Sequence, residues 1–181
     1  SGGWVDNNGF TNRVYINKSC ITIKATSSNP NDTHIVGAID HNGDEYGRGP
    51  AAVRGIYIDG YATNTIVQGF TIRNCATPST DSVAAGGMAG ATVTIGGTTK
   101  NNWYTDCTFI DNAGFRGINA YGGIFLRCRF DRAYAGDLMQ EAIVIHSLFV
   151  NIAKTTECGT KYLINGGKLY NCTFYNCQTD Y

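Results

Sequence analysis

The chain has 181 residues, with 14 Lys and Arg against 14 Asp and Glu, so its formal net charge at pH 7 is zero. This balance argues against a nucleic-acid or anionic-membrane partner, which would favour a basic surface. Charged residues make up only 15% of the chain, and its Gly, Thr and Asn content is typical of extracellular β-proteins with many tight turns. The length predicts one domain or one elongated array, and no run of 18 apolar residues that would span a membrane occurs in the sequence.

The N-terminal part contains short β-branched runs separated by Gly, Asn and Pro, a pattern typical of strands joined by turns. Residues 1–13 are predicted as an N-terminal segment before the repeats, and within it Ser1–Phe10 is Gly- and Asn-rich and a poor strand candidate. The opening Ser1-Gly2-Gly3-Trp4 resembles neither a signal peptide nor a tag, so we expect that a secretory leader has been removed. The predicted strands lie within Cys20–Lys24, His34–Asp40, Gly55–Asp59 and Asn64–Asn74. Small side chains dominate residues 77–91, which predict a loop insertion.

Five later segments align in one register. They are Phe70–Ala76, Cys107–Ala113, Cys128–Ala133, Ser147–Ala153 and Cys172–Gln178. The third position is Ile and then Phe four times, and the fifth is Asn, Asp, Arg, Asn and Asn. The first positions 107, 128, 147 and 172 are 21, 19 and 25 residues apart. Such self-similarity at a nearly fixed period is the signature of a solenoid.

The alternation within each segment identifies the kind of solenoid. Apolar side chains recur with a period of two, which predicts strands with one face inward, and no helical periodicity separates them. We therefore predict an all-β fold, a parallel β-helix that forms a single-stranded solenoid of about eight coils spaced about 4.8 Å apart. Phe109, Phe130, Phe149 and Phe174 should then stack in a row inside the coils.

The same runs resemble a known group of proteins. GFTIRN at 69–74 and NCTF at 171–174, together with the Gly-Gly pairs before several strands, are similar to the repeats of bacterial extracellular right-handed β-helix proteins of the polymorphic outer-membrane and Bacteroidetes surface types. The resemblance covers roughly residues 14–178 and implies the pectate-lyase-like fold. Because that fold also carries lyases, hydrolases, adhesins and filaments, it does not identify the activity.

One stretch is similar to the alginate and chondroitin lyases of this fold. In Gln140–Ser147, Glu141 matches the acidic position of those enzymes, but Val144 stands where they have Arg. His146 is a candidate base, with a hydrogen-bonded surface histidine as the alternative. Because no acid–base pair is evident, we expect no turnover of pectate, alginate or chondroitin.

The sequence also contains candidate residues for a metal site and for sugar contacts. Asp40, Asp44 and Glu45 lie in an acidic loop, where a calcium site is the alternative to a solvated turn, although the spacing is not that of a calcium-binding hand. No cofactor is otherwise implied. Exposed tyrosines that would stack on sugar rings are Tyr46, Tyr57, Tyr61 and Tyr121.

The seven cysteines have three interpretations. They act as buried small hydrophobes, or Cys107 and Cys128 form a disulfide between neighbouring coils, or one is a catalytic thiolate, for which no His partner is evident.

Several positions carry glycosylation signals. Asn17, Asn31 and Asn171 begin Asn-x-Ser/Thr sequons. Ser82, in Asp81-Ser82-Val83, resembles the O-glycosylation site of Bacteroidetes.

These observations predict a secreted structural or adhesive protein of the cell surface, with a carbohydrate-active or carbohydrate-binding β-helix as the alternative. An ice-binding module is excluded because it would need a regular Thr-x-Thr in every coil, which the isolated Thr92-Val93-Thr94 does not provide. The exposed edges of the terminal coils predict head-to-tail self-association into a filament, or continuation into a longer protein. The expected contacts are Trp4 at one end and Cys172 to Tyr181 at the other.

Overall fold

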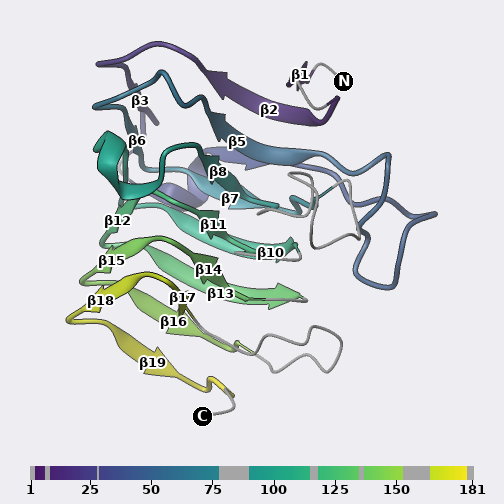
Figure 1. Cartoon of the computed structure of the whole chain (residues 1–181). Coiled ribbons are helices and arrows are strands. Elements are labelled where there is room, and N and C mark those ends of the chain that lie inside the picture. Colours follow the sequence, from purple (N-terminus) through teal and green to yellow (C-terminus); the bar gives the residue numbers. More distant parts are fainter. Residues whose placement is uncertain are drawn as a thin grey trace.

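The structure of the chain is a computed structural model. It describes residues 3–6, 9–27, 29–77, 90–114, 118–134, 137–152 and 164–178. These ranges are mostly strand, with short 3₁₀ turns at η1 (Pro30–Asp32) and η3 (Gly97–Lys100), so the all-β class is confirmed (Figure 1). Within them no helix is long and apolar enough to cross a membrane.

The strands form three sheets, here named A, B and C. Sheet A contains β1 (Trp4–Val5), β2 (Thr11–Ile16), β5 (Arg54–Ile58), β8 (Thr92–Thr94), β11 (Ala120–Tyr121), β14 (Met139–Gln140) and β17 (Ile164–Asn165). Sheet B contains β3 (Thr22–Lys24), β6 (Ile66–Gln68), β9 (Trp103–Thr105), β12 (Ile124–Leu126), β15 (Ile143–Ile145) and β18 (Lys168–Tyr170). Sheet C contains β4 (His34–Val36), β7 (Thr71–Arg73), β10 (Thr108–Ala113), β13 (Arg129–Tyr134), β16 (Leu148–Val150) and β19 (Thr173–Tyr175).

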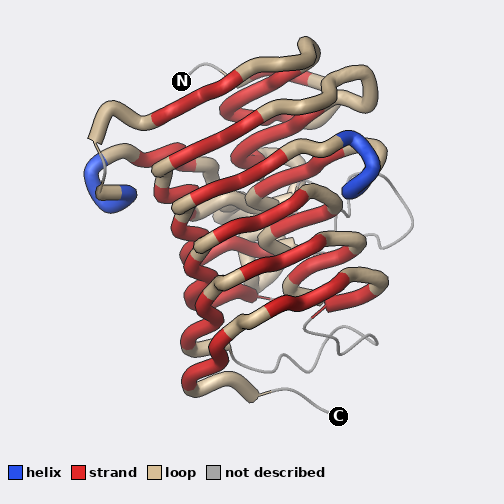
Figure 2. Tube along the Cα trace, turned by 90° about the vertical axis from the view of Figure 1, so that its left-hand side faces the viewer, coloured by secondary structure: helices blue, strands red, loops and turns tan. Residues whose placement is uncertain are grey.

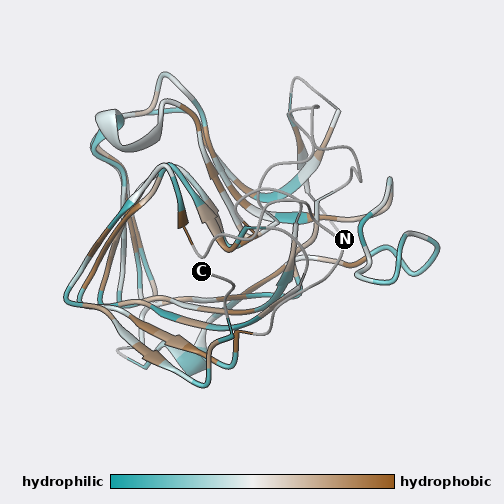
Figure 3. Ribbon diagram, turned by 60° about the horizontal axis from the view of Figure 1, so that its bottom comes forward, coloured by the Kyte–Doolittle hydropathy of each residue, from teal (hydrophilic) through white to brown (hydrophobic). Residues whose placement is uncertain are grey.

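Consecutive strands contribute to A, B and C in turn, and we call each such set of three a rung. Rung 1 is β2, β3 and β4, and rung 6 is β17, β18 and β19. Each strand pairs in parallel with its equivalent in the next rung, and Figure 2 shows the resulting stack from the side. Viewed closer to the stacking direction, the rungs overlie one another around a shared interior (Figure 3).

The described residues form six rungs, where the repeat spacing predicts about eight. The difference arises in the N-terminal part of the chain. Val14 of β2 pairs with Ile56 of β5, 42 residues later, whereas Phe109 and Phe130, also paired, are 21 residues apart. The additional residues of the earlier rung lie in loops outside the three sheets. Dividing the chain length by the spacing of the later rungs therefore overestimates the number of rungs.

The predicted phenylalanine row is confirmed. Phe109, Phe130, Phe149 and Phe174 are paired in successive rungs, and their ring centroids are 5.0, 4.9 and 4.8 Å apart. The first three side chains are fully buried, whereas Phe174 in rung 6 is 44% exposed. This row forms the sheet C wall of the core.

Sheet B supplies a second inward row. Tyr104, Phe125 and Val144 are fully buried, and the rings of Tyr104 and Phe125 stack with centroids 4.7 Å apart. The Tyr104 hydroxyl lies 3.0 Å from the Thr94 hydroxyl, so its polar end is satisfied inside the core. Val144 replaces the Arg of the lyase pattern at a position that points into the core.

The corners between sheets explain the polar columns of the repeat. Residues there adopt left-handed backbone conformations, which Gly tolerates fully and Asn and Asp better than most side chains. At the A–B corner they are Cys20, Asn64, Asn101, Gly122, Glu141 and Gly166; at the B–C corner Gly69, Asp106, Arg127, His146 and Asn171; at the C–A corner Asn74, Asp111, Arg132, Asn151 and Asn176. Asp111 and Arg132 lie inside the bounds of β10 and β13, at the point where the β10–β13 pairing skips both residues. The Asn, Asp, Arg, Asn, Asn column is therefore the C–A corner.

The N-terminal segment is more ordered than its composition predicts. Trp4–Val5 forms β1, which pairs antiparallel with β2 and covers the outer edge of sheet A. The Trp4 indole stacks on the Tyr15 ring with centroids 3.4 Å apart. Asp6 forms a buried ion pair with Arg54, whose Nε also donates to Asn12 at 3.0 Å. Within Ser1–Phe10, which its composition makes a poor strand candidate, Trp4–Val5 thus forms a two-residue strand, and β2 begins after this stretch, at Thr11.

Candidate functional site

A groove on the outer surface of sheet C is the best candidate site. It has a volume of about 460 Å³ and crosses rungs 3 to 5. Its polar lining comes from two parallel columns of the fold. Asp106, Arg127 and His146 occupy the B–C corner, and Thr108 and Arg129 occupy outward positions of β10 and β13. Pro30 of η1 also lines the groove, with Leu148 as an apolar contact.

The left-handed corner positions the first column. Asp106, Arg127 and His146 have φ of 55°, 52° and 48° and each directly follows a strand of sheet B. Because each corner is repeated in the next rung, these side chains lie one strand spacing apart, about 4.8 Å. The groove is therefore lined by a regular row of side chains.

One ion pair bridges two rungs inside the groove. Arg127 donates from Nε and Nη2 to the two Asp106 carboxylate oxygens at 2.7 and 2.9 Å. The Arg127 hydrogen bonds, supported by Gln68, lower the pKa of Asp106, and Asp106 raises the pKa of Arg127. Asp106 is therefore a carboxylate at neutral pH and fixes the orientation of the guanidinium.

The groove retains unused hydrogen-bond donors. Arg127 and Arg129 are 55% and 44% exposed, and Arg129 pairs with Asp131 at 2.7 Å. A guanidinium has five N–H donors, so each keeps several that face solvent. The exposed His146 ring has no hydrogen-bond partner within the described part of the chain. This arrangement is suited to binding an anionic group.

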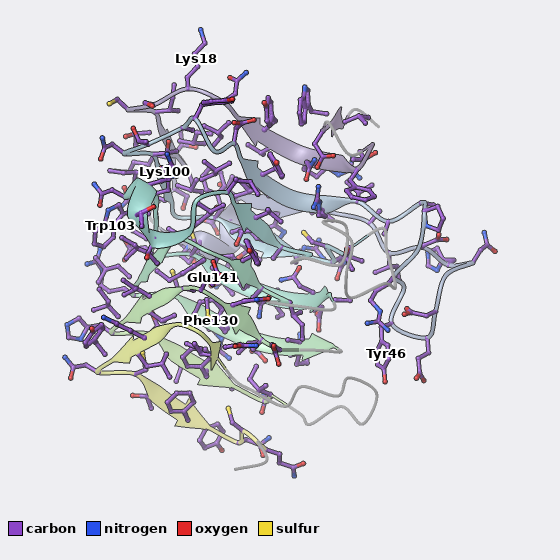
Figure 4. The ribbon with its side chains drawn as sticks, in the orientation of Figure 1. Lys18, Tyr46, Lys100, Trp103, Phe130 and Glu141 are labelled. Atoms are coloured by element: carbon purple, nitrogen blue, oxygen red, sulfur yellow. The ribbon has the colours of Figure 1, made fainter. Side chains whose placement is uncertain are left out.

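The structure places the two candidate catalytic residues of the lyase-like stretch, Glu141 and His146, apart from each other. Glu141 lies at the A–B corner and His146 at the B–C corner, at opposite ends of β15. Glu141 instead lies beside Gly97 of η3 and Gly166. Figure 4 labels Glu141. His146 shares its groove with Asp106, Arg127 and Arg129, which the sequence analysis did not select.

A signal for these missed residues is present in the repeat. Asp106, Arg127, His146 and Asn171 each directly precede the first position of an aligned segment. If this column is interpreted as an outward-facing corner, it predicts that the ionisable side chains of Asp106, Arg127 and His146 lie close together.

Two carboxylates of the acidic loop, those of Asp40 and Asp44, bind groups of the same loop. Asp40 accepts backbone N–H groups from Asn42 and Ala51 at 2.9 and 3.0 Å, which lowers its pKa. Asp44 accepts from the backbone of Tyr46 and pairs with the Arg48 side chain. Glu45 is exposed, and the described ranges contain no cluster of three or more metal-binding side chains. These hydrogen bonds hold the loop, in which Asp40 and Arg48 are buried.

The candidate glycosylation sites differ in what can be described. Asn17, Asn31 and Asn171 are all exposed, Asn171 at a left-handed corner. Ser82 lies outside the described residues, as do most of the predicted 77–91 insertion and Tyr181.

The four selected tyrosines do not form one surface. Tyr61 is 89% exposed, whereas Tyr57 packs near the Tyr15 ring with centroids 5.9 Å apart. Tyr46 lies under the Arg48 guanidinium at 5.3 Å and lines a separate small pocket. Tyr121 is partly buried in β11.

The described cysteines are free thiols, and Cys75, Cys107 and Cys128 are buried as the small-hydrophobe interpretation expects, whereas Cys20 is exposed. Cys107 and Cys128 occupy neighbouring rungs without a disulfide, and their thiols contact backbone carbonyls of Val67 and Tyr104. Burial raises the pKa of Cys75 to about 12 and that of Cys107 to about 11, and raises that of Cys128 as well.

These thiols should differ sharply in reactivity. Because only the thiolate is a nucleophile, we expect iodoacetamide at pH 8 to label exposed Cys20 at least tenfold faster than Cys75, Cys107 or Cys128. Peptide mass spectrometry of the native protein measures this, with urea-unfolded protein as the control. Equal labelling of Cys20 and Cys128 under native conditions would contradict the buried placement.

Comparison with known proteins finds no matching family model, no matching curated protein and no matching solved structure.

Proposed function

We propose that the chain is a right-handed parallel β-helix that acts outside the cell as an adhesive protein and binds an acidic saccharide chain in the sheet C groove. The observation that supports this proposal is the grouping of Arg127, Arg129 and His146 in one open groove. The stacked rungs provide a rigid support for these side chains. In this proposal the protein is an adhesive member of the group that its repeats resemble.

The groove chemistry supports an anionic ligand. The groove lining contains the guanidinium groups of Arg127 and Arg129 and the imidazole of His146. It contains one carboxylate, that of Asp106. Guanidinium binds carboxylate and sulfate groups through paired, charge-assisted hydrogen bonds. The Asp106–Arg127 contact leaves guanidinium donors free, so a ligand does not have to break it.

The groove shape supports a polymer. The side chains of successive rungs repeat about every 4.8 Å, and residues of three successive rungs line the groove. An acidic saccharide lying along the stack would meet the donors of Arg127 and Arg129 on one rung and the His146 ring on the next. Thr108 and Leu148 supply a hydroxyl and an apolar contact for the remaining faces of the sugar rings.

Arg129→Ala should weaken this binding. Hydrogen bonds to charged groups contribute about 1.5–3 kcal/mol, so we expect the Kd for a hexuronate oligosaccharide to rise roughly tenfold or more. Titration calorimetry measures the change, with a neutral oligosaccharide of equal length as the ligand control.

Arg132→Ala is the matched protein control. Arg132 is 45% exposed and pairs with Asp111 across rungs as Arg127 pairs with Asp106, but it lies at the C–A corner outside the groove. The proposal requires the Arg132 variant to bind like wild type. Equal loss in both variants, or no binding of acidic oligosaccharides by wild type, would refute it.

A polysaccharide lyase is the second candidate function. It is favoured by His146, a potential base, in the same groove as two guanidinium groups that would neutralise a uronate carboxylate. Ultraviolet-absorbing unsaturated products from wild type, lost in His146→Ala and retained in Glu141→Gln, would establish it. Binding without product would favour the adhesive protein.

A further inference from the structure

A second pocket lies at the C–A corner of rungs 2 and 3, beside the loop that joins β4 to β5. It has a volume of about 240 Å³. The loop lines it with Ile39, Glu45 and Tyr46, and the rungs line it with Asn74, Asp111 and Ala113. Figure 4 labels Tyr46, whose loop projects from the stack. We call this hollow the corner pocket; it shares no lining residue with the sheet C groove.

Internal contacts fix the loop side of the corner pocket. Asp44 accepts the backbone N–H groups of Tyr46 and Arg48 at 3.0 and 2.9 Å and also pairs with the Arg48 side chain, which is 5% exposed. The Arg48 guanidinium lies 5.3 Å from the centroid of the Tyr46 ring, and that ring packs against Ala76 and Ala113. The ring is therefore held in place without a ligand, which lowers the entropy cost of binding one.

The lining combines an apolar part with a polar part. Ile39 is 40% exposed and, with the Tyr46 ring and Ala113, supplies the apolar part. The side chains of Glu45 and Asn74 form no hydrogen bond with any other residue that the structure describes. They leave a carboxylate and an amide for a ligand at the edge of the apolar surface.

This chemistry distinguishes between classes of ligand. An anion is disfavoured, because the lining holds the carboxylates of Glu45 and Asp111 and no basic side chain. A metal ion is disfavoured as well, because both Asp111 oxygens accept hydrogen bonds from Arg132, at 2.8 and 3.0 Å. A small ammonium ion would leave Ile39 uncovered. An uncharged ring with one apolar face and several hydroxyl donors uses both parts of the lining.

We propose that the corner pocket binds one uncharged hexopyranose ring. The apolar face of the sugar packs against Ile39 and Tyr46, and its hydroxyl groups donate to the Glu45 carboxylate and the Asn74 amide oxygen. Hydrogen bonds to an ionised carboxylate are the stronger kind, so Glu45 contributes most. The volume is below the roughly 300–1,000 Å³ of pockets for drug-sized ligands, which suits a single ring. This site goes beyond the acidic-saccharide groove and does not depend on it.

Titration of the ¹⁵N-labelled full chain with the methyl glycosides of glucose, galactose and mannose tests the proposal. At least one should shift the amides of Glu45, Tyr46 and Asn74 in a saturable way. Glu45→Ala should raise its Kd at least roughly tenfold. Glu45 is exposed, so the variant should fold like wild type, which circular dichroism verifies. Glu141→Ala is the matched control, because it removes an exposed carboxylate at the A–B corner and should leave the Kd unchanged.

No saturable shift in the corner pocket with any of the three glycosides at high concentration overturns the proposal. Equal weakening by Glu45→Ala and Glu141→Ala also overturns it. The two sites are tested independently, since Arg129→Ala should not change hexoside binding and Glu45→Ala should not change hexuronate binding. A neutral oligosaccharide held in the corner pocket is equally unaffected by Arg129→Ala, so it remains a valid control for the groove.

Discussion

Replacing Phe130 with Ala should lower the free energy of unfolding by about 3–5 kcal/mol, because truncating a buried aromatic side chain leaves a cavity. Phe130 is fully buried and stacks between Phe109 and Phe149, at 5.0 and 4.9 Å. It also contacts the Phe125 ring edge-on at 5.7 Å. Urea denaturation followed by circular dichroism measures the loss.

Phe174→Ala is the control for this experiment. Phe174 belongs to the same row but is 44% exposed and stacks on one ring, that of Phe149. At a concentration where the protein is monomeric, its loss should be less than half that of Phe130→Ala. Equal losses would mean that stacking in the core does not determine the stability of the rungs.

Asp6→Ala should lower the free energy of unfolding by a similar amount to Phe130→Ala, about 3–5 kcal/mol, because it leaves the buried Arg54 guanidinium without its counter-charge. The Arg54 and Asp6 side chains are each 1% exposed. Burial lowers the pKa of Arg54, and Asp6 opposes that shift. Thermal unfolding of the variant should show the loss directly.

Two further variants test the cause. Combining Asp6→Ala with Arg54→Met removes both charges and should recover part of the lost stability, since apolar replacement of a buried pair is often tolerated. Asp111→Ala breaks the exposed pair with Arg132 and should change stability by about 1 kcal/mol or less. A double variant no better than Asp6→Ala would show that packing of β1, rather than charge, accounts for the effect.

The sequence predicts the later rungs well because each is short and repeats the same alternation. Phe109, Phe130 and Phe149 fall in one column at nearly constant spacing, so their register follows from the strand period alone. The number of rungs cannot be predicted from this spacing, because the loops between β2 and β5 are longer than those between the later strands.

β1 could not be predicted from local pattern. Two residues, Trp4 and Val5, form a strand only because Tyr15 and Arg54 supply a stacking ring and a buried charge from later in the chain. The sequence around Trp4 contains no strand signal of its own. Tertiary contacts determine this element.

The groove was partly predictable. The sequence identifies His146 as a candidate base and Glu141 as a separate candidate from the lyase-like stretch, without pairing them. The structure separates the two across β15 and joins His146 to Asp106 and Arg127, which are distant in sequence. In a stacked fold, residues one rung apart are closer than residues at the two ends of a strand.

Chemical-shift mapping with an acidic oligosaccharide tests the groove most directly. Titration of a hexuronate oligomer into ¹⁵N-labelled protein should perturb the amides of Thr108, Arg129 and His146 in a saturable way. The aromatic cluster of Tyr15 and Tyr57, on sheet A, should be unaffected. Saturable shifts confined to Tyr15 and Tyr57, or none in the groove at saturating oligosaccharide, would contradict the proposed function.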